Sequence, residues 1–133
     1  MTPGREFPDG WTAEELALVD VAVELEMAAH RPDGSLRPAT PIWVVCAEGQ
    51  VYVRSWYRRD TGWFGAVLRS RRARVTVPGL TAEVVVEDVG AAAPGVDAAY
   101  RGKYGHDGAG SMVTDAAAAT TLRLVPERPV TGT

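Results

Sequence analysis

The sequence predicts an α+β domain built on a mainly antiparallel β-barrel of about six strands, with three short helices. Two observations support this fold class. Apolar and polar residues alternate over several short segments, which is the repeat of half-buried strands. The dipeptides Asp33-Gly34 and Pro78-Gly79 separate such segments and are typical of hairpin turns.

The first half of the chain contains one helix and three strands in series. Thr12 and Glu15 form a capping-box pattern, which predicts a short helix over residues 13–20. From about Val21 the period changes to two, and a strand is expected there. Asp33-Gly34 then turns the chain into a return strand near Leu36–Cys46. After the turn "AEGQ" we expect a third strand, over Val51–Trp56.

The second half alternates helices with strands. Asp60 or Thr61 is expected to cap a helix that runs to about Arg69. The segments "ARVTV" and "TAEVVVEDV" predict a second hairpin. Helical spacing of Val96, Tyr100 and Tyr104 predicts a helix that stops at Gly105. One further helical turn through "DAAAA" and a last strand over Thr120–Val125 complete the expected elements.

Length and composition fit one soluble domain. The chain has 133 residues, of which 46% are hydrophobic and 23% charged, so we expect a single domain over 1–133, with an N-terminal arm at 1–10 and a C-terminal tail at 126–133. No apolar run approaches the roughly 20 residues that span a bilayer, and the start lacks the apolar core of a secretory signal. We therefore expect a cytoplasmic location and no membrane partner.

Arginine is concentrated in one part of an acidic chain. The net charge is −3, yet seven arginines and one acid lie between Arg54 and Arg74. This local excess of six positive charges suggests a nearby anion. For the run 69–74, a solvated helix end is the favoured interpretation. No recognisable nucleic-acid reading motif accompanies the cluster, so we do not expect nucleic-acid binding.

Arg58 and Arg59 are the stronger candidates for binding an anion. They end a predicted strand and precede a helix, whose first N–H groups and dipole favour a phosphate. Pairing with Asp60 or with other surface acids is the alternative. Arg54 lies earlier, on the same strand face as Tyr52, and could contact the polar edge of a ligand or cover an aromatic ring as a cation.

Other candidate reactive groups are sparse. One cysteine and two histidines do not predict a zinc site, and Cys46 in an apolar strand reads as an inert core thiol. Glu24 and Glu26 share a strand face and could form an acid–base pair or be surface carboxylates. His106 could titrate near neutrality.

Several segments resemble known proteins. "VYVRSWYRRDTGWFGAVLRS", followed by "RRARVTV", resembles the split-barrel flavoproteins, which include pyridoxamine phosphate oxidase-like enzymes and deazaflavin-dependent reductases. "RPDGSLRPATPIWVV" is similar to the basic hairpin of the deazaflavin group, although its basic turn is shorter. With "TAEELALVDVAVELEMAAH", "AAYRGKYG" and "TTLRLVPE", the chain is identified as a member of the bacterial family called domain of unknown function 2255.

The resemblance implies a split barrel that binds flavin mononucleotide (FMN) or the deazaflavin coenzyme F-420 and acts as an oxidoreductase on a small organic substrate. A homodimer is implied as well. The expected cofactor-binding residues are Arg54 and Ser55 at the ring, Arg58, Arg59, Thr61 and Gly62 at the phosphate, and Trp63 at the hydrophobic wall. Tyr100, Lys103 and Tyr104 are the expected substrate pocket, and ordinary helix packing is their alternative interpretation.

Two other functions stay open at this point. A split barrel without a cofactor could act as a cyclase or isomerase on a hydrophobic metabolite. It could also bind a small molecule without turnover, since one fold supports many functions.

Overall fold

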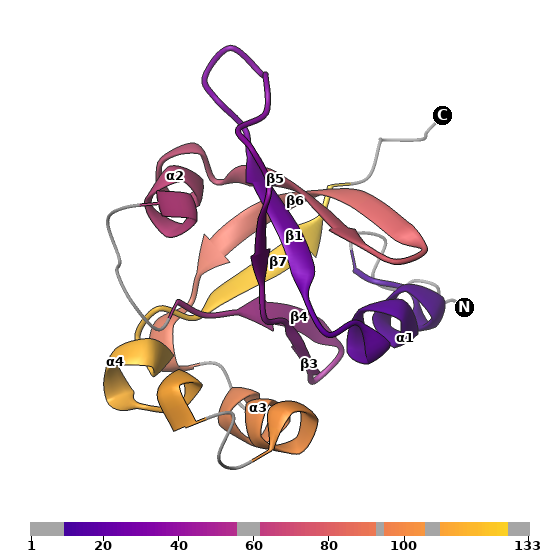
Figure 1. The fold of residues 1–133 in the computed structure, drawn as a ribbon, viewed down its shortest axis with the longest axis vertical. Coiled ribbons are helices and arrows are strands. Elements are labelled where there is room, and N and C mark those ends of the chain that lie inside the picture. Colours follow the sequence, from indigo (N-terminus) through magenta and orange to yellow (C-terminus); the bar gives the residue numbers. More distant parts are fainter. Residues whose placement is uncertain (1–9, 56–61, 93–94, 106–109, 128–133) are drawn as a thin grey trace, which may run out of the picture.

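A single antiparallel sheet curls into a half-barrel (Figure 1). The computed structural model describes residues 10–55, 62–92, 95–105 and 110–127. The strands follow the order β2-β1-β5-β6-β7-β4-β3 across the sheet. They are β1 (Leu25–Ala29), β2 (Thr40–Ile42), β3 (Val45–Ala47), β4 (Gln50–Val53), β5 (Arg72–Val77), β6 (Leu80–Asp88) and β7 (Leu122–Pro126). The predicted fold class is confirmed.

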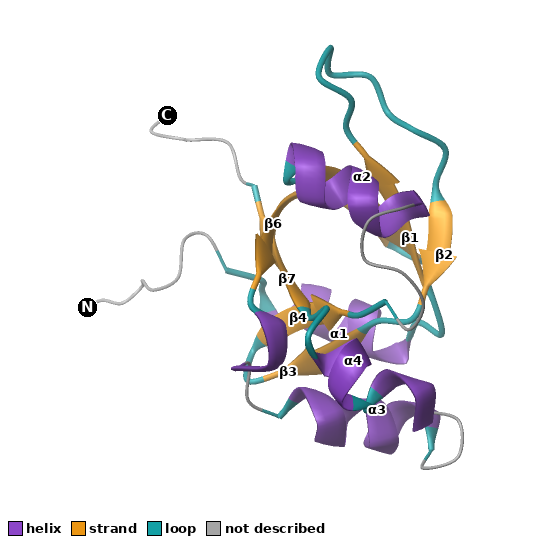
Figure 2. Ribbon diagram, turned by 90° about the vertical axis from the view of Figure 1, so that its left-hand side faces the viewer, coloured by secondary structure: helices purple, strands orange, loops and turns teal. Residues whose placement is uncertain are grey.

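Helices cover two separate regions of this sheet. The helix α2 (Gly62–Ser70) contacts β1, β5 and β6, whereas α3 (Val96–Tyr104) contacts β3. Figure 2 shows α3 beside α4 (Asp115–Ala118), below β3 and β4, with α2 at the opposite end of the barrel. The remaining helix is α1 (Ala13–Val21), and 3₁₀ turns lie at Gly90–Ala92 and Gly110–Met112. Three short helices were expected, and α4 is the additional turn in "DAAAA".

The expected return strand over Leu36–Cys46 is two strands on opposite edges of the sheet. β2 pairs with β1, and β3 pairs with β4. Between them, Val44 is bound by side chains of α3: its N–H donates to Tyr104 Oη at 3.1 Å, and Lys103 Nζ donates to its carbonyl at 2.8 Å. Tyr104 and Lys103 thus bind the N–H and carbonyl groups of Val44, which a neighbouring strand would bind if the strand were continuous. The described sheet therefore has seven strands rather than about six.

The predicted helix cap at Thr12 is confirmed, and the predicted start of the first strand is corrected. Thr12 caps α1 with both hydrogen bonds of the capping box, because Thr12 Oγ1 accepts from the Glu15 N–H and Glu15 Oε1 accepts from the Thr12 N–H. The following strand begins at Leu25 rather than near Val21. Val21 and Val23 are 78% and 70% exposed because α1 extends through Val21 and residues 22–24 only connect it to β1.

The alternation predicted on the third strand is present and buries both faces of β4. Val51 and Val53 belong to the main core inside the curled sheet, where they join Leu25, Phe64 and many other apolar side chains. Tyr52 points to a second core beneath α3, formed with Val45, Val96, Tyr100 and Met112. The sheet thus separates two apolar clusters, as the two-residue repeat requires.

Arg54, directly after β4, ties the second core together. Its side chain is buried, and Nη1 lies 2.6 Å from Asp97 Oδ1 and 2.7 Å from the Met112 carbonyl oxygen. Nε donates to Thr121 Oγ1 at 2.8 Å, and the guanidinium carbon lies 5.5 Å from the centre of the Tyr100 ring. A single side chain therefore links β4 to α3, to the turn at Met112 and to the start of β7.

We expect Arg54→Met to lower the free energy of unfolding by about 2–3 kcal/mol, because buried hydrogen-bond acceptors lose a charged donor. Asp97 adds little to this loss, since its side chain is 46% exposed and stays hydrated. Urea denaturation followed by circular dichroism measures the change. Arg101→Met, at an exposed position of α3, is the matched control and should change stability by less than about 0.5 kcal/mol. Equal effects of the two variants would contradict this account.

Candidate functional site

A basic hollow of about 470 Å³ lies between the β1–β2 loop and the C-terminal half of α2. This volume is within the usual range of small-molecule sites, about 300–1,000 Å³. We call it the arginine hollow, and it is lined by His30, Arg31, Pro32, Arg37, Ala66, Arg69, Ser70 and Arg72. Four of these residues are arginines and none is acidic.

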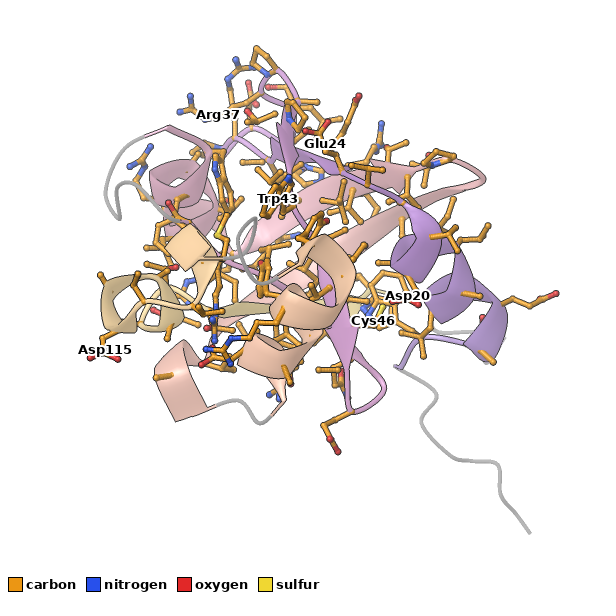
Figure 3. The ribbon with its side chains drawn as sticks, turned by 60° about the horizontal axis from the view of Figure 1, so that its bottom comes forward. Asp20, Glu24, Arg37, Trp43, Cys46 and Asp115 are labelled. Carbon is orange, nitrogen blue, oxygen red and sulfur yellow. The ribbon has the colours of Figure 1, made fainter. Side chains whose placement is uncertain are left out.

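Strand pairing brings these side chains together. β1 pairs antiparallel with β5, with Ala29 opposite Ala73, and the His30 N–H donates to the Arg72 carbonyl at 3.0 Å. The β1–β2 loop returns to the same place because the Arg37 N–H donates to the Ala29 carbonyl at 2.9 Å. α2 packs on β1 and adds Arg69 from its last turn. Figure 3 shows Arg37 on this loop, close to α2.

The arginines of the hollow differ in what already binds them. Arg72 pairs with Glu127, and Arg31 Nη1 donates to the Leu36 carbonyl at 2.9 Å, which braces the loop. Within the described parts of the chain, no carboxylate pairs with Arg37 or Arg69. Both side chains are exposed at the hollow, so their planar N–H forks can donate hydrogen bonds to an anionic ligand.

His30 lies in the wall of the arginine hollow and is held by two hydrogen-bond partners. Its Nε2 lies 2.6 Å from Glu83 Oε1, and its Nδ1 lies 3.3 Å from the Gly34 carbonyl oxygen. Each ring nitrogen of His30 therefore has an oxygen within hydrogen-bond distance. Burial opposes ionisation of Glu83, but hydrogen bonds from Arg74 and His30 outweigh it and lower the pKa of this carboxyl. The resulting carboxylate holds the His30 ring in place.

Of the residues predicted to bind the phosphate, Arg58, Arg59 and Thr61 lie outside the described residues. Gly62 and Trp63 open α2, at the other end of this helix from Arg69. The Trp63 ring is partly buried and meets Phe64 edge-on, with ring centres 5.4 Å apart. Cofactor binding by these residues stays a prediction.

The residues predicted to contact the ring of the cofactor are both buried. Arg54 has the contacts given above, including the cation-over-ring geometry that the sequence allowed. The Ser55 N–H donates to Thr120 Oγ1 at 2.9 Å, and that hydroxyl donates to the Ser55 carbonyl at the same distance. These contacts fix the end of β4. Contact with a ligand stays a prediction for both residues.

The predicted substrate pocket on α3 lies away from the arginine hollow. Tyr104 stacks on Trp43 with ring centres 4.0 Å apart and bonds to the Val23 carbonyl at 2.6 Å. Lys103 Nζ donates to the carbonyls of Val19 and Val44. Tyr100 is buried, its hydroxyl has no hydrogen-bond partner among the described residues, and burial raises its pKa. These contacts are those of helix packing, and a substrate-binding role stays a prediction.

The remaining candidate groups are dispersed. Glu24 precedes β1, and Glu26 is exposed on it. His106 lies outside the described residues. In the described part of the chain, no group of three His, Cys, Asp or Glu side chains is placed to hold a metal ion. Among the same residues, every helix is too short or too polar to cross a membrane.

The sequence does not predict that the residues lining the arginine hollow lie together. The two basic segments that form it, 31–37 and 69–74, are both visible in the sequence. Taken separately, the first segment predicts a short basic hairpin and the second a solvated helix end. Only the pairing of β1 with β5 connects them, and no local pattern specifies that pairing.

The curled antiparallel sheet with α2 across one end defines a split-barrel protein. The chain belongs to the family described as "Uncharacterized protein conserved in bacteria (DUF2255)", whose model matches residues 15–124. No curated protein matches the sequence.

Solved structures share the fold at low sequence identity. HutZ, a heme storage protein from Vibrio cholerae, has a TM-score of 0.65 at 12% identity, over 90% of this chain and 92% of that one. An F420 reductase has a TM-score of 0.51 at 17% identity, over 84% and 92%. An FAD-binding protein from Mesorhizobium loti has a TM-score of 0.52 at 12% identity, over 89% and 91%. A heme storage protein, an F420 reductase and an FAD-binding protein therefore share this fold.

The pKa of the Cys46 thiol, which lies near α1, can be tested by measuring its reactivity. Its thiol donates to the Leu16 carbonyl at 3.6 Å, and burial, together with Asp20, raises its pKa to about 11. Because only the thiolate reacts, alkylation by iodoacetamide near pH 7 should be roughly 100-fold slower in the folded protein than in urea. The folded-state rate should keep rising up to about pH 11.

The sequence holds a single cysteine, so Cys46→Ala gives the unlabelled baseline. A folded-state rate that levels off near pH 8.5, the ordinary range of a thiol, would contradict the assignment.

Proposed function

We propose that the protein is an oxidoreductase that binds FMN or the deazaflavin coenzyme F-420 and acts on a small organic molecule. The observation that carries the proposal is the arginine hollow, which Arg37 and Arg69 both line without a carboxylate partner among the described residues. An anionic cofactor would supply the missing negative charge.

The residues of the hollow fit a phosphate or carboxylate group. Guanidinium forks bind such groups through two parallel N–H donors, and four arginines line the hollow. The C-terminal end of α2 opposes an anion through its dipole. Arg69, in the last turn of that helix, and Arg37, from the loop facing it, supply full positive charges that outweigh this partial negative one.

The protein's own share of the chemistry is binding and orientation. A flavin or deazaflavin ring supplies the hydride chemistry when it is bound, so no catalytic triad is required of the chain. The arginine hollow would anchor the charged end of the cofactor, and the loop braced by Arg31 would fix where that end lies. The F420 reductase and the FAD-binding protein of the same fold support this choice of cofactor class.

We expect saturable binding of FMN or coenzyme F-420, followed by quenching of tryptophan fluorescence. Heme is the third ligand of the titration, because one protein of this fold is a heme storage protein. The double variant Arg37→Gln, Arg69→Gln should weaken binding by about 10- to 100-fold, because a hydrogen bond to a charged group is worth about 1.5–3 kcal/mol. Arg101→Gln, on exposed α3, is the matched control and should bind as the unmodified protein does.

A second double variant, Arg58→Gln, Arg59→Gln, tests whether the anion binds this basic pair, which precedes α2 in the sequence, instead of the arginine hollow. Loss of binding in this variant alone would place the anion at the start of α2, which leaves the function intact and refutes the role of the arginine hollow. No binding of either flavin or deazaflavin would refute the proposal and favour a barrel that acts without a redox cofactor.

A further inference from the structure

A second hollow, of about 320 Å³, lies between α1, β3 and α3. It shares no lining residue with the arginine hollow and is formed by Asp20, Val45, Cys46, Ala99, Gly102 and Lys103. Figure 3 shows Asp20 of α1 and Cys46 of β3 next to each other on this side of the molecule. We call it the Gly102 hollow.

Gly102 has no structural reason to be glycine. It lies inside α3, where glycine is one of the poorest helix formers, and its backbone is not in the left-handed region. A Cβ atom at this position would meet no atom within 4 Å outside the helix backbone. Neither conformation nor close packing therefore demands glycine. Its effect is to leave open space at the wall of the hollow.

Lys103 supplies a cation whose hydrogen bonding is incomplete. An ammonium group has three N–H donors, and Lys103 Nζ uses two of them on the carbonyls of Val19 and Val44. Among the described residues, no third acceptor lies within hydrogen-bond distance. Burial lowers the pKa of this ammonium, and the neighbouring Cys46 and Asp20 act in the opposite direction. A carboxylate in the hollow would complete the set of acceptors.

Asp20 supplies the opposite charge at the exposed side of the same hollow. Cys46, another lining residue, has its pKa raised by burial and is held as a neutral thiol, so it is poorly suited to covalent chemistry near neutral pH. Val45 and Ala99 add a small apolar wall. The lining thus presents one cation, one anion and a short apolar surface.

We propose that the Gly102 hollow is a binding site for a small amino acid, whose carboxylate accepts from Lys103 and whose ammonium pairs with Asp20. Gly102 leaves the room that the ligand occupies. The site binds without a covalent step and is separate from the proposed cofactor site.

Three ligands of similar size test the charge pattern: L-alanine, propionate and ethylamine. Isothermal titration calorimetry should show saturable binding of L-alanine with a Kd below about 1 mM. Propionate and ethylamine each lack one of the two charges, and each should bind at least about tenfold more weakly, because each loses one charge-assisted contact. Binding of L-alanine and propionate with equal affinity would overturn the role of Asp20, and absence of L-alanine binding would overturn the site.

Variants at Gly102 separate ligand binding from stability. Gly102→Ala should raise the melting temperature by about 2–5 °C, because alanine is the better helix former. Gly102→Leu should fold at least as well as the unmodified protein and abolish L-alanine binding, because its side chain fills the hollow. Retained binding in a folded Gly102→Leu variant would overturn the proposal.

Charge variants complete the test. Asp20→Asn should remove the preference for L-alanine over propionate and leave propionate binding unchanged. Lys103→Met should abolish binding of both, and Gly102→Leu remains the decisive variant if this substitution unfolds the chain, since Lys103 also joins α1 to Val44. Arg101→Met, one residue away on the exposed face, should bind L-alanine normally. Gly102→Leu should leave FMN or F-420 titration unchanged, which keeps failure here distinct from failure of the cofactor proposal.

Discussion

The antiparallel pairing of β1 with β5 is the constraint on which the rest of this structure depends. It places Ala29 opposite Ala73 and so sets the β1–β2 loop beside the segment that follows α2. α2 then packs across β1, β5 and β6. A slip of β1 by one residue against β5 would turn Met27 away from the core, so the hydrophobic pattern fixes the position of the basic loop.

Positive charge is concentrated where this pairing brings two basic segments together. Such a cluster is unfavourable in an empty site, and the protein offsets part of it with carboxylates from other strands. Glu83 of β6 binds His30 and Arg74, and Glu127, just after β7, binds Arg72. Arg37 and Arg69 have no such partner among the described residues. The excess positive charge therefore lies at the arginine hollow, where it would stabilise an anionic ligand.

At the other end of the molecule, polar side chains hold the elements together, partly through hydrogen bonds to backbone groups. Arg54 is buried against α3, and Lys103 and Tyr104 extend from α3 to the carbonyl and N–H groups of Val44. Because buried backbone groups need partners, these contacts let the chain leave β2 and enter β3 without an unbroken strand. They also place Lys103 beside Asp20 and Cys46, which no single segment of the chain contains together.

The sequence by itself determined the local elements and the kind of fold. The cap at Thr12, the turn around Gly49, the hairpin at Pro78-Gly79 and the helix stop at Gly105 all depend on residues a few positions apart, which pattern reasoning can interpret. The family resemblance was readable as well. Only the tertiary structure decided that residues 36–46 form two edge strands, and that Arg37 and Arg69 share one hollow. These outcomes depend on contacts between residues distant in the sequence, whose pairing is set by the whole core.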